Sequence, residues 1–149
     1  MGEDGRARAG AGAALLARMA GDWTLRREIE DRRAGGVGRY EGTAAFAPEP
    51  GGLRYREAGT LLLPGRPALV AERRYLWRAD GDRVIVTFDD GRPFHAFDAR
   101  LDRPEAGHDC APDRYEVAYD FASWPAWRAV WVVRGPRKDY ALRGLYRPA

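Results

Sequence analysis

The chain has 149 residues, of which 45% are hydrophobic and 32% are charged, and this composition excludes a disordered chain and indicates one globular domain. No apolar run approaches the roughly 20 residues that a membrane-spanning helix needs, so we expect no contact with a membrane. The net charge of +3 arises from 25 basic and 22 acidic residues that are interspersed along the chain, which predicts no nucleic-acid partner.

The first residues of the chain lack the pattern of a secretory signal, because two acidic residues come first and Arg18 interrupts the apolar stretch. Cys110 is the only cysteine, which excludes an internal disulfide and is typical of a reducing compartment. We therefore expect a cytoplasmic protein, a monomer or homodimer, with one domain over residues 1–149 and a flexible N-terminus over residues 1–10.

The predicted elements begin with one helix at residues 11–20, where Leu15 and Met19 share an apolar face and Gly21 provides a stop. After Gly21 the apolar residues recur with a period of two, and short turns rich in Gly, Pro and Asp interrupt them. This pattern predicts strands at residues 23–29, 37–47, 53–63, 68–78, 83–88, 93–101, 114–121, 127–134 and 140–147. The segment 102–113 contains two prolines and a glycine, so we expect it to be the longest loop, mobile or facing a ligand.

The order of these elements predicts the topology. Successive strands that are joined by short hairpins, without a second helix for a parallel crossover, form an antiparallel meander. A sheet of this length exposes its edges unless it closes on itself. We therefore predict an all-β, antiparallel up-and-down β-barrel of about 8 to 10 strands, with a short N-terminal helix.

A tripeptide at the start of the first predicted strand resembles a feature of a known fold. Gly21-Asp22-Trp23 follows the helix and resembles the G-x-W signature of lipocalins and other calycins. In those barrels the tryptophan fills the closed end, and an arginine of the last strand packs across its ring. The resemblance implies a lipocalin-like (calycin) barrel in which Trp23 has this structural role and Arg143 or Arg147 covers it through a cation–π contact.

Three longer blocks extend the resemblance over most of the chain. They are residues 88–95 (FDDGRPFH), 108–115 (HDCAPDRY) and 131–140 (WVVRGPRKDY). These blocks resemble those of a family of short uncharacterised proteins, a domain of unknown function with a lipocalin-like fold. The resemblance implies the fold and brings no established activity, so the function must be inferred from the residues.

The two histidines and the single cysteine, His95, His108 and Cys110, lie close together in the sequence. On extended backbone His108 and Cys110 face the same side, and two imidazoles with a thiolate are a possible zinc or iron set. The spacing matches no established metal motif, so we expect no metal and keep a haem or zinc site as an alternative. His95 and His108 are also candidates for a general acid or base, with Tyr115 as a polarising donor. The structural alternative is two hydrogen-bonded histidines and a small buried thiol.

Alternating residues divide each strand into two faces, one of which lines the barrel. Tyr115, Tyr119, Trp127 and Trp131 alternate with charged residues, so these aromatic side chains share one side of their strands. If this side faces the lumen, the aromatic side chains either fill it or line a pocket in it. Small residues at matching positions leave room, which favours a cavity for one small ligand. These small residues are Gly42, Ala44, Gly59 and Ala96.

Two charged residues are candidates for special positions. Glu57 shares a face with Tyr55, and a carboxylate inside a barrel must be paired, because an isolated buried charge is very costly. We expect an arginine partner such as Arg74, in a structural ion pair or, as the alternative, in a pair that orients a polar ligand. Lys138 is the only lysine and precedes Tyr140, so we expect either a compact ammonium at the barrel mouth or a solvated hairpin end.

Together these features predict a binding protein that holds a small, mostly apolar or aromatic molecule with a polar or anionic end inside the barrel. The residues expected to contact this molecule are Arg92, His95, His108, Cys110, Tyr115, Tyr119, Trp131, Lys138 and Tyr140. We expect no organic cofactor, and binding rather than catalysis. Three alternatives stay open: a cofactor-independent isomerase, cyclase or lyase that uses His95 or His108, a haem or metal barrel, and a barrel with a filled lumen.

Overall fold

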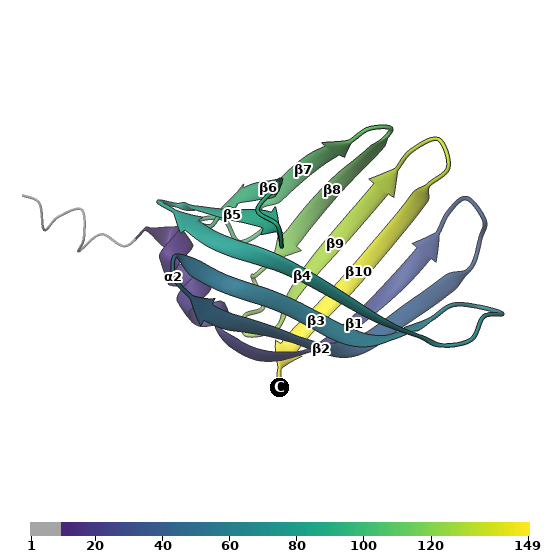
Figure 1. Cartoon of the computed structure of the whole chain (residues 1–149), viewed down its shortest axis with the longest axis horizontal. Helices are drawn as coiled ribbons and strands as arrows, with labels where there is room; N and C mark the ends of the chain where they lie inside the picture. Colours follow the sequence, from purple (N-terminus) through teal and green to yellow (C-terminus); the bar gives the residue numbers. More distant parts are fainter. Residues whose placement is uncertain (1–9) are drawn as a thin grey trace, which may run out of the picture.

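The structure is a computed structural model that describes residues 10–149 as one short helix and ten strands (Figure 1). The elements are α2 (Ala11–Met19), β1 (Gly21–Asp31), β2 (Val37–Glu49), β3 (Gly52–Leu62), β4 (Leu69–Asp80), β5 (Arg83–Phe88), β6 (Pro93–Asp98), β7 (Glu105–Cys110), β8 (Asp113–Asp120), β9 (Trp127–Arg134) and β10 (Asp139–Pro148). Nearly all of the segment expected to be flexible, residues 1–9, lies outside the described residues. No helix in the described part has both the length and the apolar character that crossing a membrane requires.

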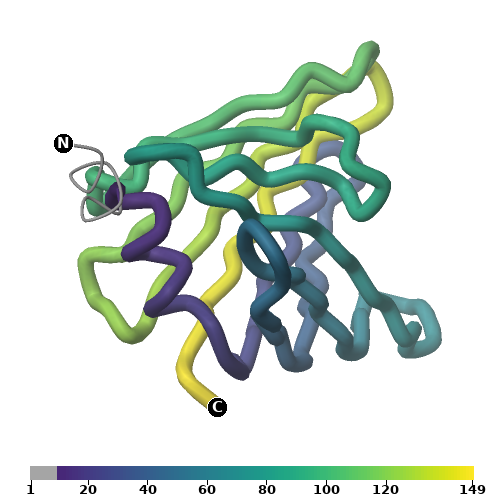
Figure 2. Tube along the Cα trace, turned by 60° about the vertical axis from the view of Figure 1, so that its left-hand side comes forward, coloured from purple at the N-terminus to yellow at the C-terminus, as the bar shows by residue number. Residues whose placement is uncertain are grey.

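The ten strands form one antiparallel sheet in which neighbours in space are almost always neighbours in sequence. The order is β6-β5-β4-β3-β2-β1-β10-β9-β8-β7, and among the described strands only the pairing of β1 with β10 departs from sequence order. The sheet curls until its two ends, β6 and β7, lie side by side, although no ladder joins them within the described residues (Figure 1, Figure 2). The predicted all-β, up-and-down antiparallel barrel is confirmed.

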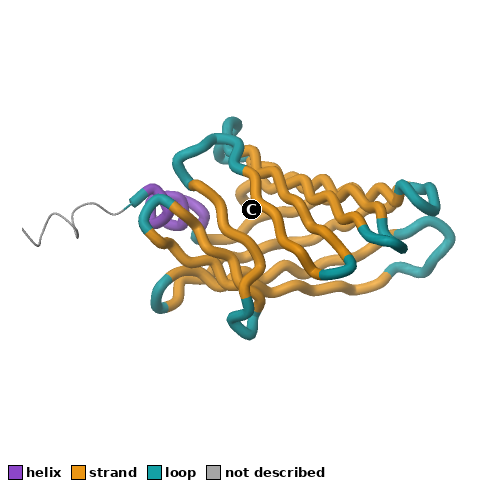
Figure 3. Tube along the Cα trace, turned by 90° about the horizontal axis from the view of Figure 1, so that it is seen from above, coloured by secondary structure: helices purple, strands orange, loops and turns teal. Residues whose placement is uncertain are grey.

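The helix α2 covers one end of this barrel (Figure 3). Its apolar face, formed by Leu15, Leu16 and Met19, is buried. The backbone N–H of Gly12 donates to the carbonyl oxygen of Gly81 at 3.1 Å, which fixes the helix to the turn between β4 and β5. Each buried side chain of this size contributes about 1.5 to 3 kcal/mol relative to its exposed form. The helix therefore seals one end, and the hairpin turns surround the other.

Trp23 lies at the closed end, as expected, but the prediction that Arg143 or Arg147 covers its ring is wrong. Its indole N–H donates to the carbonyl oxygen of Met19 at 2.9 Å, and its ring meets Trp124 and Trp127 edge-on at 5.5 and 6.0 Å. On β10, Arg143 and Arg147 point to the outer face, because their register partners on β1 are the outward-facing neighbours of the buried residues.

The outer arginine contacts follow from this register. Arg143 pairs with Glu28 at 3.5 Å and with Glu30 at 3.2 Å, and Arg147 is exposed. The cation–π contact at this end of the barrel comes instead from the helix, where Arg18 lies 5.1 Å from the ring centroid of Trp124. Of the lipocalin-like pattern, the tryptophan at the closed end is therefore present, whereas the arginine of the last strand that would cover its ring is not.

The expected long loop at residues 102–113 is wrong, because it contains the strand β7. This strand pairs with β8 from Glu105↔Ala118 to Cys110↔Asp113. The two prolines of the segment lie just outside the strand and mark its ends, and Gly107 within it contacts the side chain of Arg114 on β8. β7 is a short, mostly polar edge strand, which lacks the apolar alternation that identifies strands in a sequence.

The small residues expected to leave room in the lumen have several different roles. Gly42 and Gly59 lie opposite each other on β2 and β3, where a Cβ on either would collide with the backbone of the other strand. They permit a close approach of the two strands. Ala44 is buried in the core, whereas Ala96 is paired with Ile85 on the outer face, so its expected place inside the barrel is wrong.

Candidate functional site

The barrel encloses a cavity with a volume of about 940 Å³. All nine residues that the sequence analysis expected to contact a ligand line this cavity: Arg92, His95, His108, Cys110, Tyr115, Tyr119, Trp131, Lys138 and Tyr140. The lumen is therefore not filled, although aromatic side chains line much of it. Alternation along the strands brings these residues together, because every second side chain faces the interior.

The inner part of the cavity is aromatic. Trp127 and Tyr146 stack with their ring centroids 3.7 Å apart and their planes 2° from parallel. Tyr119 lies between Trp127 and Trp77, at 6.4 and 5.9 Å from their ring centroids. These four side chains are buried. They form a rigid apolar surface below the open part of the cavity.

A β-bulge directs two consecutive residues of β6 into the lumen. Val86 pairs with His95, whereas the next residue of β5, Thr87, pairs with Pro93, so Phe94 is an extra residue in the ladder. Phe94 and His95 are both buried and both line the cavity. The ring of Phe94 stacks on Trp131 of β9 at 5.1 Å, and this contact crosses the seam between β6 and β7.

His95 lies deep in the wall. Its Nε2 forms a hydrogen bond of 2.8 Å with the Tyr119 hydroxyl, and its Nδ1 has no partner among the described residues. Burial lowers the pKa of His95 to about 3, with a smaller contribution from His108. His95 is therefore neutral near pH 7, and it acts in the cavity wall as a hydrogen-bonding group.

His108, Tyr115 and Cys110 lie nearer to the open end. His108 is half-buried, and its ring meets Phe94 and Phe88 edge-on at 5.3 and 5.9 Å. Cys110 is exposed. Across residues 10–149, no group of three His, Cys, Asp or Glu side chains is arranged to hold a metal ion. The metal set of His95, His108 and Cys110, which the sequence left as an alternative, is therefore not assembled.

The two cations expected at the mouth are already paired. Lys138 lies 3.0 Å from a carboxylate oxygen of Asp113, and this hydrogen bond raises the pKa of the lysine. Arg92 lies 2.7 Å from Asp90 and also covers the ring of Phe88, at 5.4 Å from its centroid. Both side chains line the cavity, but the positive charge of each is balanced by an aspartate.

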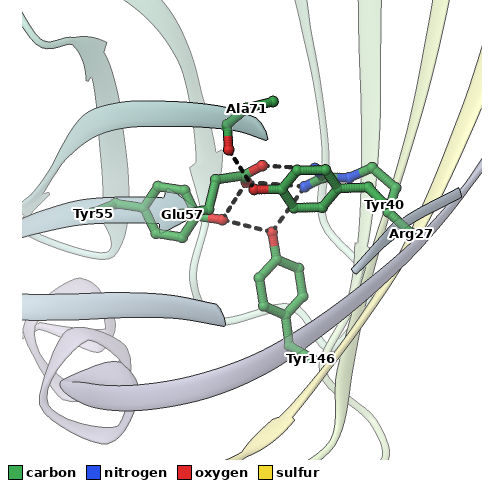
Figure 4. A network of polar contacts seen from close by, with 6 residues as sticks. All are labelled: Arg27, Tyr40, Tyr55, Glu57, Ala71 and Tyr146. Carbon is green, nitrogen blue, oxygen red and sulfur yellow. Dashed lines mark hydrogen bonds and ion pairs between the residues drawn. The ribbon is translucent and has the colours of Figure 1, made fainter. Parts of the chain in front are cut away.

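A buried polar cluster occupies one side of the cavity (Figure 4). Arg27 donates two hydrogen bonds to Glu57, at 2.7 and 3.0 Å, and a third to the Tyr146 hydroxyl at 3.3 Å. The Tyr55 hydroxyl donates to Glu57 at 2.6 Å and lies 2.9 Å from the Tyr146 hydroxyl. The guanidinium of Arg27 also lies over the ring of Tyr40. The paired carboxylate inside the barrel is confirmed.

The expected partner of Glu57 is wrong. Arg74 belongs to the outer face of β4, where it pairs with Glu72 at 2.7 Å. Burial acts to raise the pKa of Glu57, but the hydrogen bonds and charge of Arg27 outweigh it, so the net pKa is lowered. Glu57 is therefore an ionised carboxylate in the barrel wall, and burial raises the pKa of the neighbouring Tyr146 to about 12. The cluster is a charge-balanced pair held by neutral phenols.

A protein-family model matches residues 19–148, which include every strand of the barrel. The chain belongs to the family of unknown function DUF6314. No curated protein matches it significantly. Among solved structures it is similar to the S-type phycobiliprotein lyase CPES from Guillardia theta, with a TM-score of 0.57 and 10% sequence identity over 91% of this chain and 92% of that chain. A similarity at this identity concerns the fold, and it confirms the calycin-like barrel.

In this DUF6314 protein the sequence analysis missed two lumen arginines. Arg27 alternates with Trp23 and Leu25, so its inward direction was visible, but its contact with Glu57 joins strands that are not sequence neighbours. Arg73 faces the interior beside Glu57 on the paired strand and lines the cavity. Arg73 alternates with Tyr75 and Trp77 on β4, and this pattern indicates that Arg73 faces the interior. The sequence analysis placed Arg74 on the inner face instead, and so it missed Arg73.

Proposed function

We propose that this DUF6314 protein binds a small, mostly apolar or aromatic molecule with an anionic end inside its barrel. The observation that carries the proposal is the cavity of about 940 Å³. Pockets that hold small molecules in proteins measure about 300 to 1,000 Å³. A barrel that served only as a stable scaffold would fill this space, because unfilled volume costs packing energy.

The walls of the cavity favour a ligand with a flat apolar part. Phe94 is nearly parallel to Trp131, and it also stacks with Phe88 at 4.6 Å and with Tyr75 at 5.4 Å. Ring-to-ring contacts of this kind contribute about 0.5 to 1.5 kcal/mol each beyond the apolar area that they bury. A conjugated or aromatic ligand therefore gains more from these walls than an aliphatic one.

The charges around the cavity favour a negative group at the other end of the ligand. Glu57 is the only acidic residue among the described residues that line the cavity, and Arg27 balances it. Arg73 adds a positive charge nearer to solvent, and Arg92 and Lys138, each paired with an aspartate, add further hydrogen-bond donors. A carboxylate or similar group placed there meets complementary potential.

The environment of His95 favours a role in binding over one in catalysis for this residue. A general acid or base works best with a pKa near the operating pH, and the pKa of His95 is about 3. Its Nδ1 is buried in the wall and has no hydrogen-bond partner among the described residues.

The proposal is tested with the fluorescent probe phenylnaphthylamine, an uncharged molecule with two aromatic ring systems. We expect saturable binding with one probe per chain and a Kd on the order of 1 to 10 μM. Ala71→Trp projects a large side chain into the cavity from β4 and is expected to weaken binding about tenfold. Native mass spectrometry of protein purified without added ligand would show whether a molecule is retained.

The matched control is Ala58→Trp, on the outer face of the adjacent strand β3. It adds the same side chain outside the barrel and should leave the Kd within about twofold. Thermal unfolding of both variants confirms that they are folded. The proposal is wrong if the wild-type protein binds no probe and carries no excess mass, or if both variants weaken binding equally.

A further inference from the structure

Arg73 differs from the other cations around the cavity because it has no acidic partner of its own. Lys138 is paired with Asp113 and Arg92 with Asp90. On either side of Arg73 in the sequence, Glu72 and Arg74 face outward and pair with each other. Within residues 10–149, no ion pair includes Arg73.

The carboxylate nearest to Arg73 is already saturated. Glu57 lies opposite Arg73 in the ladder between β3 and β4. Both oxygens of Glu57 accept hydrogen bonds from Arg27, and one of them also accepts from Tyr55. Arg27 therefore balances Glu57, and the group of Arg27, Glu57 and Arg73 keeps one positive charge in excess.

The strand that carries Arg73 gives it access to both the cavity and solvent. β5 pairs with β4 only from Tyr75 to Asp80, so the half of β4 that precedes Tyr75 has no neighbour on that side. Arg73 lies in this half and is exposed, although it belongs to the inner face and lines the cavity. A charged group of a ligand can therefore reach Arg73 without losing all of its water, while the apolar part enters the aromatic lumen.

From this arrangement we infer that Arg73 is the anchor for the anionic group of the ligand, and that the ligand is a monoanion whose charge is a planar or tetrahedral oxyanion on an aromatic body. The inference rests on the proposed function. One excess positive charge matches one negative charge, and a guanidinium binds carboxylate, sulfonate or phosphate oxygens through two parallel hydrogen bonds. Ser, Thr and Asn donors are absent from the described cavity lining, and Arg73 is the cation of that lining without an acidic partner among the described residues.

Two probes that share the same ring systems separate charge recognition from apolar binding. Anilinonaphthalene sulfonate carries one sulfonate, and phenylnaphthylamine carries none. In wild-type protein we expect the sulfonate probe to bind more tightly. Arg73→Gln should raise the Kd of the sulfonate probe about tenfold and leave the Kd of the neutral probe within about twofold.

Arg74→Gln is the matched control, because it removes the same charge from the next position of the same strand but from the outer face. It should change the Kd of neither probe. Equal loss of both probes in Arg73→Gln would overturn the inference, since packing and not charge would then be responsible. An unchanged sulfonate Kd in Arg73→Gln would overturn it as well and leave the proposed function standing. If wild-type protein binds neither probe and carries no excess mass, the proposed function itself fails.

Discussion

Glu57→Gln is expected to lower the free energy of unfolding by about 3 to 5 kcal/mol, because it leaves the Arg27 guanidinium buried without a counter-charge. Arg27 is 8% exposed and Glu57 is 2% exposed, so neither charge is well solvated in the folded protein. The substitution keeps the shape of the side chain, so the loss reports charge and not volume. Urea denaturation at pH 7, followed by tryptophan fluorescence, measures it.

A double variant shows whether the loss comes from the unpaired charge. Replacing both partners, Arg27→Met with Glu57→Leu, removes the buried charges together and should recover most of the stability. Glu72→Gln is the control, because Glu72 forms a similar but exposed pair with Arg56 and should matter little. If Glu57→Gln were as stable as the wild type, water in the cavity would be solvating Arg27, and the cluster would not be a structural ion pair.

The second large effect is a loss of stability in mild acid that depends on His95. In the unfolded chain this histidine takes up a proton near pH 6.5, whereas in the folded protein its pKa is about 3. Between these two values the unfolded state binds more protons, so the free energy of unfolding falls as the pH falls from about 6.5 towards 3. From pH 7 to pH 5 the contribution of His95 to this fall is about 2 kcal/mol.

The measurement is the free energy of unfolding at pH 7 and pH 5 for the wild type and for His95→Gln. Glutamine keeps a hydrogen-bonding group beside Tyr119 but does not titrate, so its variant should lose about 2 kcal/mol less over this interval. The subtraction removes the carboxylates that titrate in both proteins. An equal fall in the two proteins would show that His95 is protonated without cost, through contact with water in the cavity.

The alternation of residues was enough to predict the barrel and most of its inner face. The sequence placed Trp131, Tyr119 and Tyr115 on one side of their strands, and the structure places all three along the cavity. This works because the period of two is a local property of each strand. The segment 102–113 was misassigned for the same reason: β7 is a polar edge strand, and polar edge strands have no apolar alternation to detect.

The errors concern features that depend on register between strands. The partner of Glu57 belongs to β1, two strands away, and a single sequence contains no information on which side chains meet across a lumen. Ala96 was expected in the lumen, but an extra residue in β6 turns His95 inward and Ala96 outward, and a one-residue shift reverses every later side chain of a strand. For the same reason, Arg74 was assigned to the inner face of β4, and Arg73, which lies there, was missed.

Around the barrel, the contact between β1 and β10 and the contact between β6 and β7 differ in what holds the two strands together. Between β1 and β10 a long ladder of hydrogen bonds joins strands from the two ends of the chain, with no covalent link between them. Between β6 and β7 the reverse holds: the chain continues from one strand to the next, but within the described residues no ladder joins them. If the chain were cut in residues 99–104 and β10 were linked to the segment of α2 and β1, the ten strands would follow one another around the ring in a single order. Every existing ladder would then connect consecutive strands. The first and last strands of the sheet are therefore held together by hydrogen bonds, and the two strands without a ladder between them are the ones that the covalent chain already connects.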